Sequence, residues 1–568
     1  MRAERLTPPL EILVMMSSTH SKRIRTVAAR IALLVAVSFA VACGGRQQGG
    51  GLQDLGFDVG VQNILDLLPS PISYAYITDF DEDDAARMRS QWRSSASGPA
   101  FASIVQSQTG YDLTNQEGLA EIGIDLLGEF GIYSTTALPV AIARLSEPMK
   151  FEEFLAGYRS RNPDMTWSSF AIADSTFWST DIEENGDHIA SFDLGVVGNY
   201  AVLRVRSPIE GSFVDDTALA ALIEGTHALS LSSDPRIASL QARADGTISS
   251  VGLLDTELFR KVFTFVTSFG EFERPENPNC DSTSDAIAQA VPWAGIVQYR
   301  AGDIRRGIHV VQLSEAAAAR AAGVLGGTSD ETFDAAADSP LFVSWNLNLD
   351  AALSLMNGDP RLTGECADLA ALSGALGTLN GQVDPVIRDF LRKLTGLFMI
   401  TLEDLNIAGF IPRVSAGFAI GSANPVPLTE VFQNALTEMG AVGSVDDTAP
   451  FTTFEYSILG FTVRISQLLD RMVLATHDVP IGLFNSMAVS EDQNGDFMQM
   501  RMLGAPIAEM LREVQRFAIG EITEEAQSQF EAVAASYESI NWMTYTLALD
   551  SNTIVGTIAV ELTPVEEE

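Results

Sequence analysis

The chain has 568 residues, of which 46% are hydrophobic, and a formal net charge of −39 at pH 7. A chain this long predicts more than one domain, since single domains usually hold about 100 to 200 residues. The negative charge argues against nucleic acid or an anionic lipid surface as a partner, because both would be repelled. The acids are spread among apolar residues, which predicts a folded protein and not an acidic disordered tail.

The stretch from Lys22 to Cys43 has the three parts of an export signal. Its first part is basic, residues 31–42 are apolar, and the small residues Ala40 and Ala42 stand just before Cys43. A bilayer-spanning helix needs about 20 apolar residues, and this run is shorter. The pattern therefore predicts cleavage of the segment and not permanent insertion.

These residues resemble the lipobox of bacterial lipoproteins, although Ala40 stands where that family favours Leu. The resemblance implies that residues 1–42 are a lipoprotein signal peptide and that Cys43 is acylated and becomes the first mature residue. It also implies attachment to the cell envelope through a lipid anchor, at the outer membrane facing the periplasm or the cell surface. An ordinary signal ending at Ala42, with a free thiol at Cys43, is the alternative.

Four blocks of sequence recur in the same order, which predicts a duplicated domain. The first block begins at Ser70 and matches a block that begins at Ser339. The second, residues 138–155, matches 415–432, and the third, residues 199–205, matches 470–476. The fourth is the clearest, because Trp293, Gly307 and Leu313 have the same spacings as Trp542, Gly556 and Leu562.

The blocks predict an α+β protein made of two tandem copies of an antiparallel sheet with helices packed on one face. Each fourth block has period-two alternation around a polar turn, at 301–303 and 550–552, which indicates a β-hairpin. We expect helices at 255–268, 284–290, 506–517 and 521–537. A parallel doubly wound sheet is the alternative.

The expected domains follow from these blocks. Residues 43–69 hold the acylated cysteine, a Gly-rich tether and a short helix, and 70–315 form the first repeat. Residues 316–338 are a partly helical linker, and 339–568 form the second repeat.

The strand, Pro turn and helix at 139–155, the strand at 199–205 and the segment at 230–242 resemble a family of exported bacterial proteins known as a domain of unknown function. The resemblance covers most of the chain after Cys43. It implies a fold and a compartment, and it brings no activity.

Two further cysteines, Cys280 and Cys366, lie in polar, turn-rich surroundings. An oxidising periplasm would allow them to form a disulfide, and two unpaired surface thiols are the alternative. The sequence has no C-x-x-C and no Cys/His cluster, so it gives no basis for a zinc or redox site.

The search for catalytic motifs finds none. The five histidines, at 20, 188, 227, 309 and 477, form no H-E-x-x-H, and no G-x-S-x-G is present. Residues 79–84 begin like a calcium loop, but Asp84 stands where Gly is needed and Ser90 where Glu is needed. Acids at a helix N-terminus explain this cluster better. We therefore expect no metal, no cofactor and no catalytic residues.

The leading hypothesis is a non-catalytic binding or scaffolding protein whose partner is an envelope component. The alternative is a periplasmic carrier of a hydrophobic ligand or lipid, motivated by the Met-rich segment 498–514, although the same stripe suits an ordinary core. A hydrolase comes third, because paired carboxylates arise by chance among 74 acids.

Overall fold

The computed structural model describes residues 64–79, 229–258, 288–326, 339–348, 351–352, 394–406, 496–517 and 524–563 and, with short gaps, 103–206, 413–446 and 452–479. These residues fall into two compact units. Unit 1 contains 64–69, 77–134 and 138–230, and unit 2 contains 70–76, 135–137 and 231–563. Strand β1 (Tyr74–Thr78) belongs in part to each unit.

Unit 1 contains an antiparallel sheet in the order β2-β3-β7-β6-β5-β4. Its elements are β2 (Phe130–Ser134), β3 (Val140–Arg144), β4 (Trp167–Ile172), β5 (Ser175–Glu184), β6 (Asp187–Val197), β7 (Tyr200–Arg206), α6 (Gln116–Glu121) and α7 (Pro148–Arg161). Helix α7 begins with a proline, which suits the first turn because that position needs no N–H donor.

Helix α7 covers one face of this sheet. Its buried side chains, Phe151, Phe154 and Leu155, pack in one cluster with Phe192 and Leu194 of β6. The Phe154 ring lies 5.7 to 6.1 Å from the rings of three neighbouring aromatic residues. The apolar side of the sheet in unit 1 is therefore removed from water.

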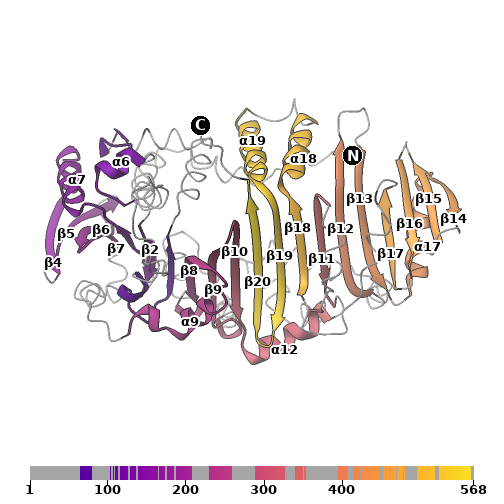
Figure 1. Cartoon of the computed structure of the whole chain (residues 1–568), viewed down its shortest axis with the longest axis horizontal. Coiled ribbons are helices and arrows are strands. Elements are labelled where there is room, and N and C mark those ends of the chain that lie inside the picture. Colours follow the sequence, from indigo (N-terminus) through magenta and orange to yellow (C-terminus); the bar gives the residue numbers. More distant parts are fainter. Residues whose placement is uncertain are drawn as a thin grey trace. The chain divides into compact units, whose positions relative to one another are not determined.

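Unit 2 contains a longer antiparallel sheet, in the order β8-β9-β10-β20-β19-β18-β11-β12-β13-β17-β16-β15-β14. Several of its strands are labelled in Figure 1. They are β8 (Thr247–Asp255), β9 (Trp293–Ala301), β10 (Ile304–Gln312), β11 (Leu341–Asn346), β12 (Leu394–Asn406), β13 (Arg413–Ser422), β14 (Val442–Asp446), β15 (Thr452–Ile458), β16 (Phe461–Gln467), β17 (Arg471–Thr476), β18 (Asp496–Leu503), β19 (Ile540–Asp550) and β20 (Thr553–Leu562).

The described part of unit 2 includes the helices η2 (Leu231–Ser233), α9 (Pro235–Gln241), α12 (Glu315–Val324), α17 (Pro425–Glu438), α18 (Gly504–Phe517) and α19 (Glu524–Glu538). Helix α17 packs on the face of Ile420, Met472 and Ile465. Helix α9 contacts β8 and β9 on the opposite face, where Leu240 lies against Gly295.

The antiparallel sheet and the mixture of helices and strands confirm the α+β prediction, and the parallel alternative is wrong for the described strands. In unit 2, α9 and α17 contact opposite faces of the sheet, and the expected packing of helices on one face of each copy stays a prediction. Both predicted hairpins, β9-β10 and β19-β20, are present. Their turns place Gly302 and Ser551 at positive φ, 65° and 57°.

Candidate functional site

The residues with the most specific predictions from the sequence lie outside the described part of the chain. Cys43, Cys280 and Cys366 all fall there, and so do residues 80–84 of the acidic cluster. The lipid anchor and the disulfide therefore remain predictions.

The two described histidines have ordinary environments. The His188 ring lies 2.8 Å from the Ser191 hydroxyl, and Ser191 in turn donates a hydrogen bond to Asp181. His309 is in β10, where burial lowers the pKa of its ring. Within the described residues, no group of three His, Cys, Asp or Glu side chains is arranged to hold a metal ion.

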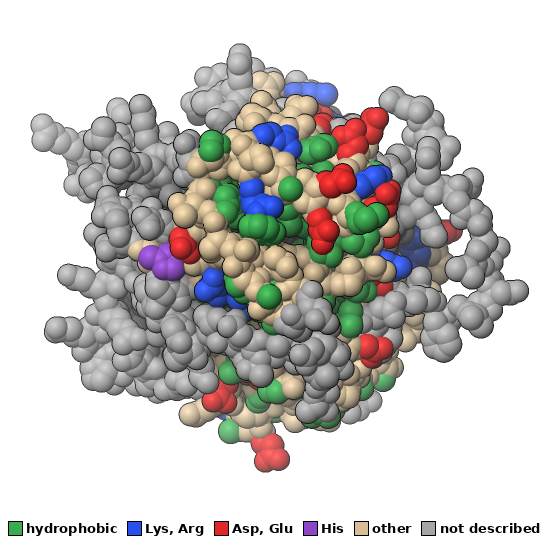
Figure 2. Space-filling view, turned by 90° about the vertical axis from the view of Figure 1, so that its left-hand side faces the viewer, with side chains coloured by type: hydrophobic (Ala, Val, Ile, Leu, Met, Phe, Trp, Pro, Cys, Tyr) green, Lys and Arg blue, Asp and Glu red, His purple; other side chains and the backbone are tan. Residues whose placement is uncertain are grey.

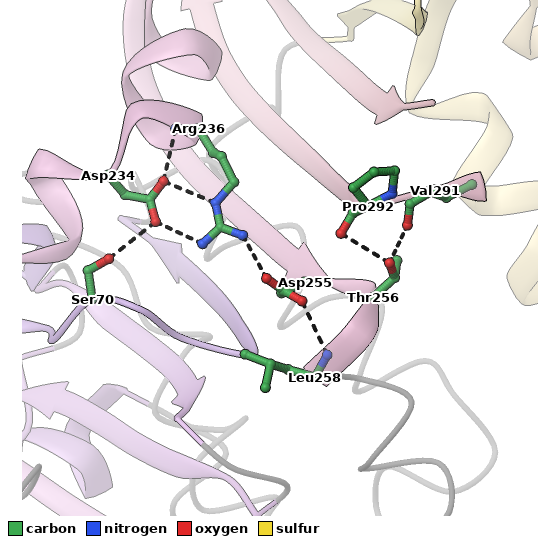
Figure 3. Close-up of polar contacts among 8 residues, drawn as sticks. All are labelled: Ser70, Asp234, Arg236, Asp255, Thr256, Leu258, Val291 and Pro292. Carbon is green, nitrogen blue, oxygen red and sulfur yellow. Dashed lines mark hydrogen bonds and ion pairs between the residues drawn. The ribbon is translucent and has the colours of Figure 1, made fainter. Parts of the chain in front are cut away.

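The best-defined polar cluster of unit 2 surrounds Arg236 (Figure 3). Asp234 caps α9 by accepting a hydrogen bond from the Arg236 backbone N–H, at 2.9 Å. The Arg236 guanidinium donates to both Asp234 carboxylate oxygens, at 3.0 and 2.8 Å, and reaches Asp255 at 3.0 Å. Ser70 donates to Asp234 at 3.3 Å. The cluster thus ties α9 to the end of β8.

The electrostatics of this cluster favour a structural role. Burial opposes ionisation of Asp234, but the hydrogen bonds from Arg236 outweigh it and hold the pKa of the carboxyl below its ordinary value. The pKa of Arg236 is raised by its hydrogen bond to Asp234. A carboxylate held ionised by a bidentate guanidinium is a poor proton donor or acceptor near neutral pH.

Unit 1 has a comparable cluster on the sheet face opposite α7. Asp193 is fully buried, and it accepts hydrogen bonds from Arg204 at 2.9 Å and from Arg206 at 2.6 and 2.8 Å. Arg206 also donates to Ser179 at 3.0 Å. These contacts join β5, β6 and β7 across three neighbouring strands.

A third polar group in unit 1 joins Glu129, Arg144 and Tyr200. The Tyr200 hydroxyl donates to Glu129 at 3.4 Å, and Arg144 donates to the same carboxylate at 3.4 Å. Burial and the neighbouring Glu129 raise the pKa of Tyr200 to about 12. The phenol therefore stays protonated and cannot act as a base.

The side of the molecule drawn in Figure 2 carries acidic, basic and hydrophobic side chains interspersed with one another.

The most unusual surface lies on unit 2, on one face of β12, β11, β18, β19 and β20. Side chains directly opposite each other in paired strands share a face. Trp345 pairs with Phe398 and Met498, and Val343 pairs with Ile400 and Met500. The rows continue through β19 and β20, so that one face carries Val343, Trp345, Phe398, Ile400, Met498, Met500, Tyr545, Leu547, Ile558 and Val560. We call these ten residues the apolar sheet face.

Most of these side chains are only half-buried, and Ile400 is 37% exposed. The rings of Trp345 and Phe398 stack at 5.7 Å, and Phe398 lies 6.5 Å from Phe418, which packs against the core under α17. The apolar sheet face is therefore continuous with a helix-covered core but extends beyond it.

The opposite side of the same strands is buried and partly polar. Ser344, Thr401 and Gln499 are each no more than 1% exposed, and they share that side with Phe342 and Met399. The strands β11, β12 and β18 thus bury several hydroxyl and amide groups while large apolar side chains remain accessible. This reverses the usual preference.

Sequence reasoning missed the apolar sheet face. The Met-rich segment 498–514 indicates an apolar stripe, but alternation in β11 and β18 does not tell which side of a strand faces the core. Helix α18 begins within this segment, at Gly504, and α19 follows it. No described helix has the length and apolar character required to cross a membrane.

No family model matches the chain, and neither does any curated protein. Three crystal forms of the protein TP0453 align with 44 to 47% of this chain and 78 to 88% of their own, at 10 to 11% identity. Their TM-scores are 0.22 to 0.23, which is too low to support an argument about fold or function.

Proposed function

We propose that the protein is an exported lipoprotein, anchored to the cell envelope through an acylated Cys43, that acts by binding and not by catalysis. The apolar sheet face is its binding surface. The anchor holds the body at the outer membrane, facing the periplasm or the cell surface, where the partner is another envelope component.

The observation that carries the proposal is the accessibility of the apolar sheet face. Contiguous apolar surface of this kind usually marks a site of interaction, because leaving it in water is unfavourable by about 25 cal/mol per Å². Five neighbouring strands contribute to it, so the surface is broad and rigid. The acidic groups near Arg236 and Arg204 have basic partners and serve to fix strands and helices.

A periplasmic carrier of a hydrophobic ligand or lipid is the second candidate. Met498 and Met500 lie at the centre of the apolar sheet face, and their unbranched, polarisable side chains adapt to differently shaped apolar ligands. This observation favours a small apolar molecule over a protein as the occupant.

The binding surface is tested with the uncharged dye N-phenyl-1-naphthylamine, which an acidic protein does not repel. We expect Ile400→Glu to lower the dye affinity of the soluble body by at least tenfold. Val514→Glu on α18 is the matched control, because Val514 is 38% exposed and Ile400 is 37% exposed. Equal dye binding by the two variants would contradict the proposal.

Mass spectrometry of organic extracts separates the two candidates. The soluble body is purified from its native envelope without detergent. A stoichiometric lipid or other apolar molecule supports the carrier, whereas a clean extract together with a cross-linked envelope protein supports the scaffold.

The anchor is tested by Cys43→Ser, which we expect to release the protein from membranes, with Cys280→Ser as the control that stays bound. Membrane retention of the Cys43 variant would refute the lipoprotein assignment.

We also infer that the chain consists of two tandem copies of one domain. The order β2-β3-β7-β6-β5-β4 in unit 1 recurs in unit 2 as β12-β13-β17-β16-β15-β14. The strands β8-β9-β10 recur as β18-β19-β20. Helices α7 and α17 occupy the same place after β3 and β13 and have 14 residues each.

The register supports the same inference residue by residue. The sequence blocks align Ile142 with Ala419 and Val202 with Val473. In the structure Ile142 pairs with Val202, and Ala419 pairs with Val473. An experimental structure in which 70–315 and 339–563 differ in strand order would refute the duplication.

A further inference from the structure

The two predicted hairpins meet along a single pair of strands. β10 pairs with β20 over the whole length of β10, from Ile304 opposite Glu561 to Gln312 opposite Thr553. All four strands, in the order β9-β10-β20-β19, belong to unit 2. The ends of the two copies are thus joined by main-chain hydrogen bonds.

The hairpins are equivalent position by position. Trp293 pairs with Gln312 at the open end of the first hairpin, and Trp542 pairs with Glu561 at the open end of the second. The positive-φ residues Gly302 and Ser551 stand at the same place in the two turns. Equivalent positions therefore differ by 249, which is the separation of Trp293 from Trp542.

This equivalence places like positions opposite each other across the junction. Ile308 is equivalent to Thr557, and these two residues are paired with each other. Arg306 is equivalent to Val555, and Ala559 is equivalent to Val310. The pair Arg306–Ala559 on one side of this centre therefore corresponds to the pair Val310–Val555 on the other side, with the two strands exchanged. A pairing with this property has a local two-fold axis through the centre of the Ile308–Thr557 pair.

Two glycines at the junction stand in positions related by the same symmetry. Gly307 and Gly556 are equivalent, and each stands opposite a larger residue, Ile558 and His309 respectively, which are themselves equivalent. A Cβ atom at Gly307 would lie 2.7 Å from a methyl carbon of Ile558, closer than real Cβ contacts. Gly307 therefore leaves room for Ile558 on the opposite strand, whereas the atoms nearest to a Cβ at Gly556 belong to Leu547 and Tyr545 of β19.

We propose that β10 and β20 form a self-complementary docking surface, so that the chain is a covalently fused dimer of its own repeat. The partner that each surface fits is a second copy of the same strand. This inference rests on the duplication proposed above. The physical reason is that antiparallel pairing allows two-fold symmetry, and such pairing covers two otherwise open strand edges at once.

The test uses paired cysteines in the full mature chain, with a short thiol-reactive cross-linker and peptide mapping by mass spectrometry. The symmetry-related variants are Arg306→Cys/Ala559→Cys and Val310→Cys/Val555→Cys. We expect both variants to give linked peptides, with yields within twofold of each other. Arg306→Cys/Val555→Cys is the control; its positions are four residues out of register, about 13 Å along the strand, and should link at least tenfold less.

A second symmetry-related set, Ile304→Cys/Glu561→Cys and Gln312→Cys/Thr553→Cys, serves if the central substitutions impair folding. Linking of only one member of a related set, or equal linking of the control, overturns the docking proposal. Failure of every pair in a chain that keeps its β-sheet circular dichroism also overturns it. That result would leave the duplication intact, because the duplication rests on strand order within each copy.

Discussion

The sheet of unit 1 buries its apolar side, whereas the central strands of unit 2 leave an apolar side only half-buried. In unit 1, Phe192 and Leu194 of β6 are buried beneath α7. In unit 2, Trp345, Phe398 and Met500 lie on a face that is only half-buried. The difference is large although both sheets are antiparallel and alternate in the same way.

The comparison teaches that what packs against a sheet face, such as a covering helix, and not the strand sequence decides which side becomes core. Helix α7 contributes Phe151, Phe154 and Leu155 to the core of unit 1. Helix α17 does the same for β13, β16 and β17 of unit 2. The apolar sheet face continues past that helix, and we interpret the remainder as the place of an external partner.

The largest expected effect comes from removing a ring of the covering helix. Phe154→Ala should lower the free energy of unfolding of unit 1 by about 4 kcal/mol, because a buried aromatic leaves a cavity. Urea unfolding measures the change in the free energy of unfolding. Met149→Ala on the same helix is the control, since Met149 is 77% exposed and its loss should cost less than about 0.5 kcal/mol. Similar losses in the two variants would break the comparison.

The buried charge of unit 1 gives the next effect. Asp193→Asn should cost about 3 kcal/mol, because it removes the carboxylate that Arg204 and Arg206 share in a buried site. Asp181→Asn on the neighbouring β5 is the control. The Asp181 side chain is 54% exposed, so its charge is screened by water and we expect less than about 1 kcal/mol. The two variants are compared by urea unfolding at pH 7. A larger loss of stability in the Asp193 variant shows that Asp193 stabilises the fold, and an equal loss contradicts this.

The apolar sheet face should tolerate truncation better than a core does. Trp345→Ala should lower the free energy of unfolding of unit 2 by about 1.5 kcal/mol, mainly through the lost stacking on Phe398. Phe342→Ala on the same strand should cost about 4 kcal/mol, because Phe342 is fully buried. If both substitutions cost the same, the apolar sheet face is an ordinary core.

The smallest effect is expected on the polar side of β11. The Ser344 hydroxyl is fully buried and has no hydrogen-bond partner among the described residues. Ser344→Ala should therefore leave stability unchanged or raise it by up to about 1 kcal/mol, since an unsatisfied buried hydroxyl is unfavourable. A loss above about 1 kcal/mol in thermal or urea unfolding would show that the hydroxyl has a partner.

Local features of the fold could be predicted from the sequence because they depend on neighbouring residues. The alternation around 301–303 and 550–552 predicted the two hairpins, and the structure places their turns there. Asp234 directly before Pro235 caps α9, and an acid followed by a proline is common at the start of a helix. The helices predicted at 506–517 and 521–537 correspond to α18 and α19, within a few residues.

Other features could not be predicted, for physical reasons. The pairing of β10 with β20 joins segments that are distant in the chain, and no local pattern specifies a partner strand. The role of Arg236 depends on Asp255, which comes from a different element. The packing of α9 and α17 on opposite faces of the sheet in unit 2 depends on tertiary contacts and not on a local pattern.

The sequence by itself determined the alternating strands, the tight turns and the mixed α+β class, because each follows from the side-chain period and from local turn chemistry. The tertiary structure decided which side of each strand meets water. In β11 the period-two pattern places Ser344 and Trp345 on opposite sides, but only the packing of the whole of unit 2 buries Ser344 and leaves Trp345 accessible. Period two defines two faces, and burial depends on what the rest of the chain lays against them.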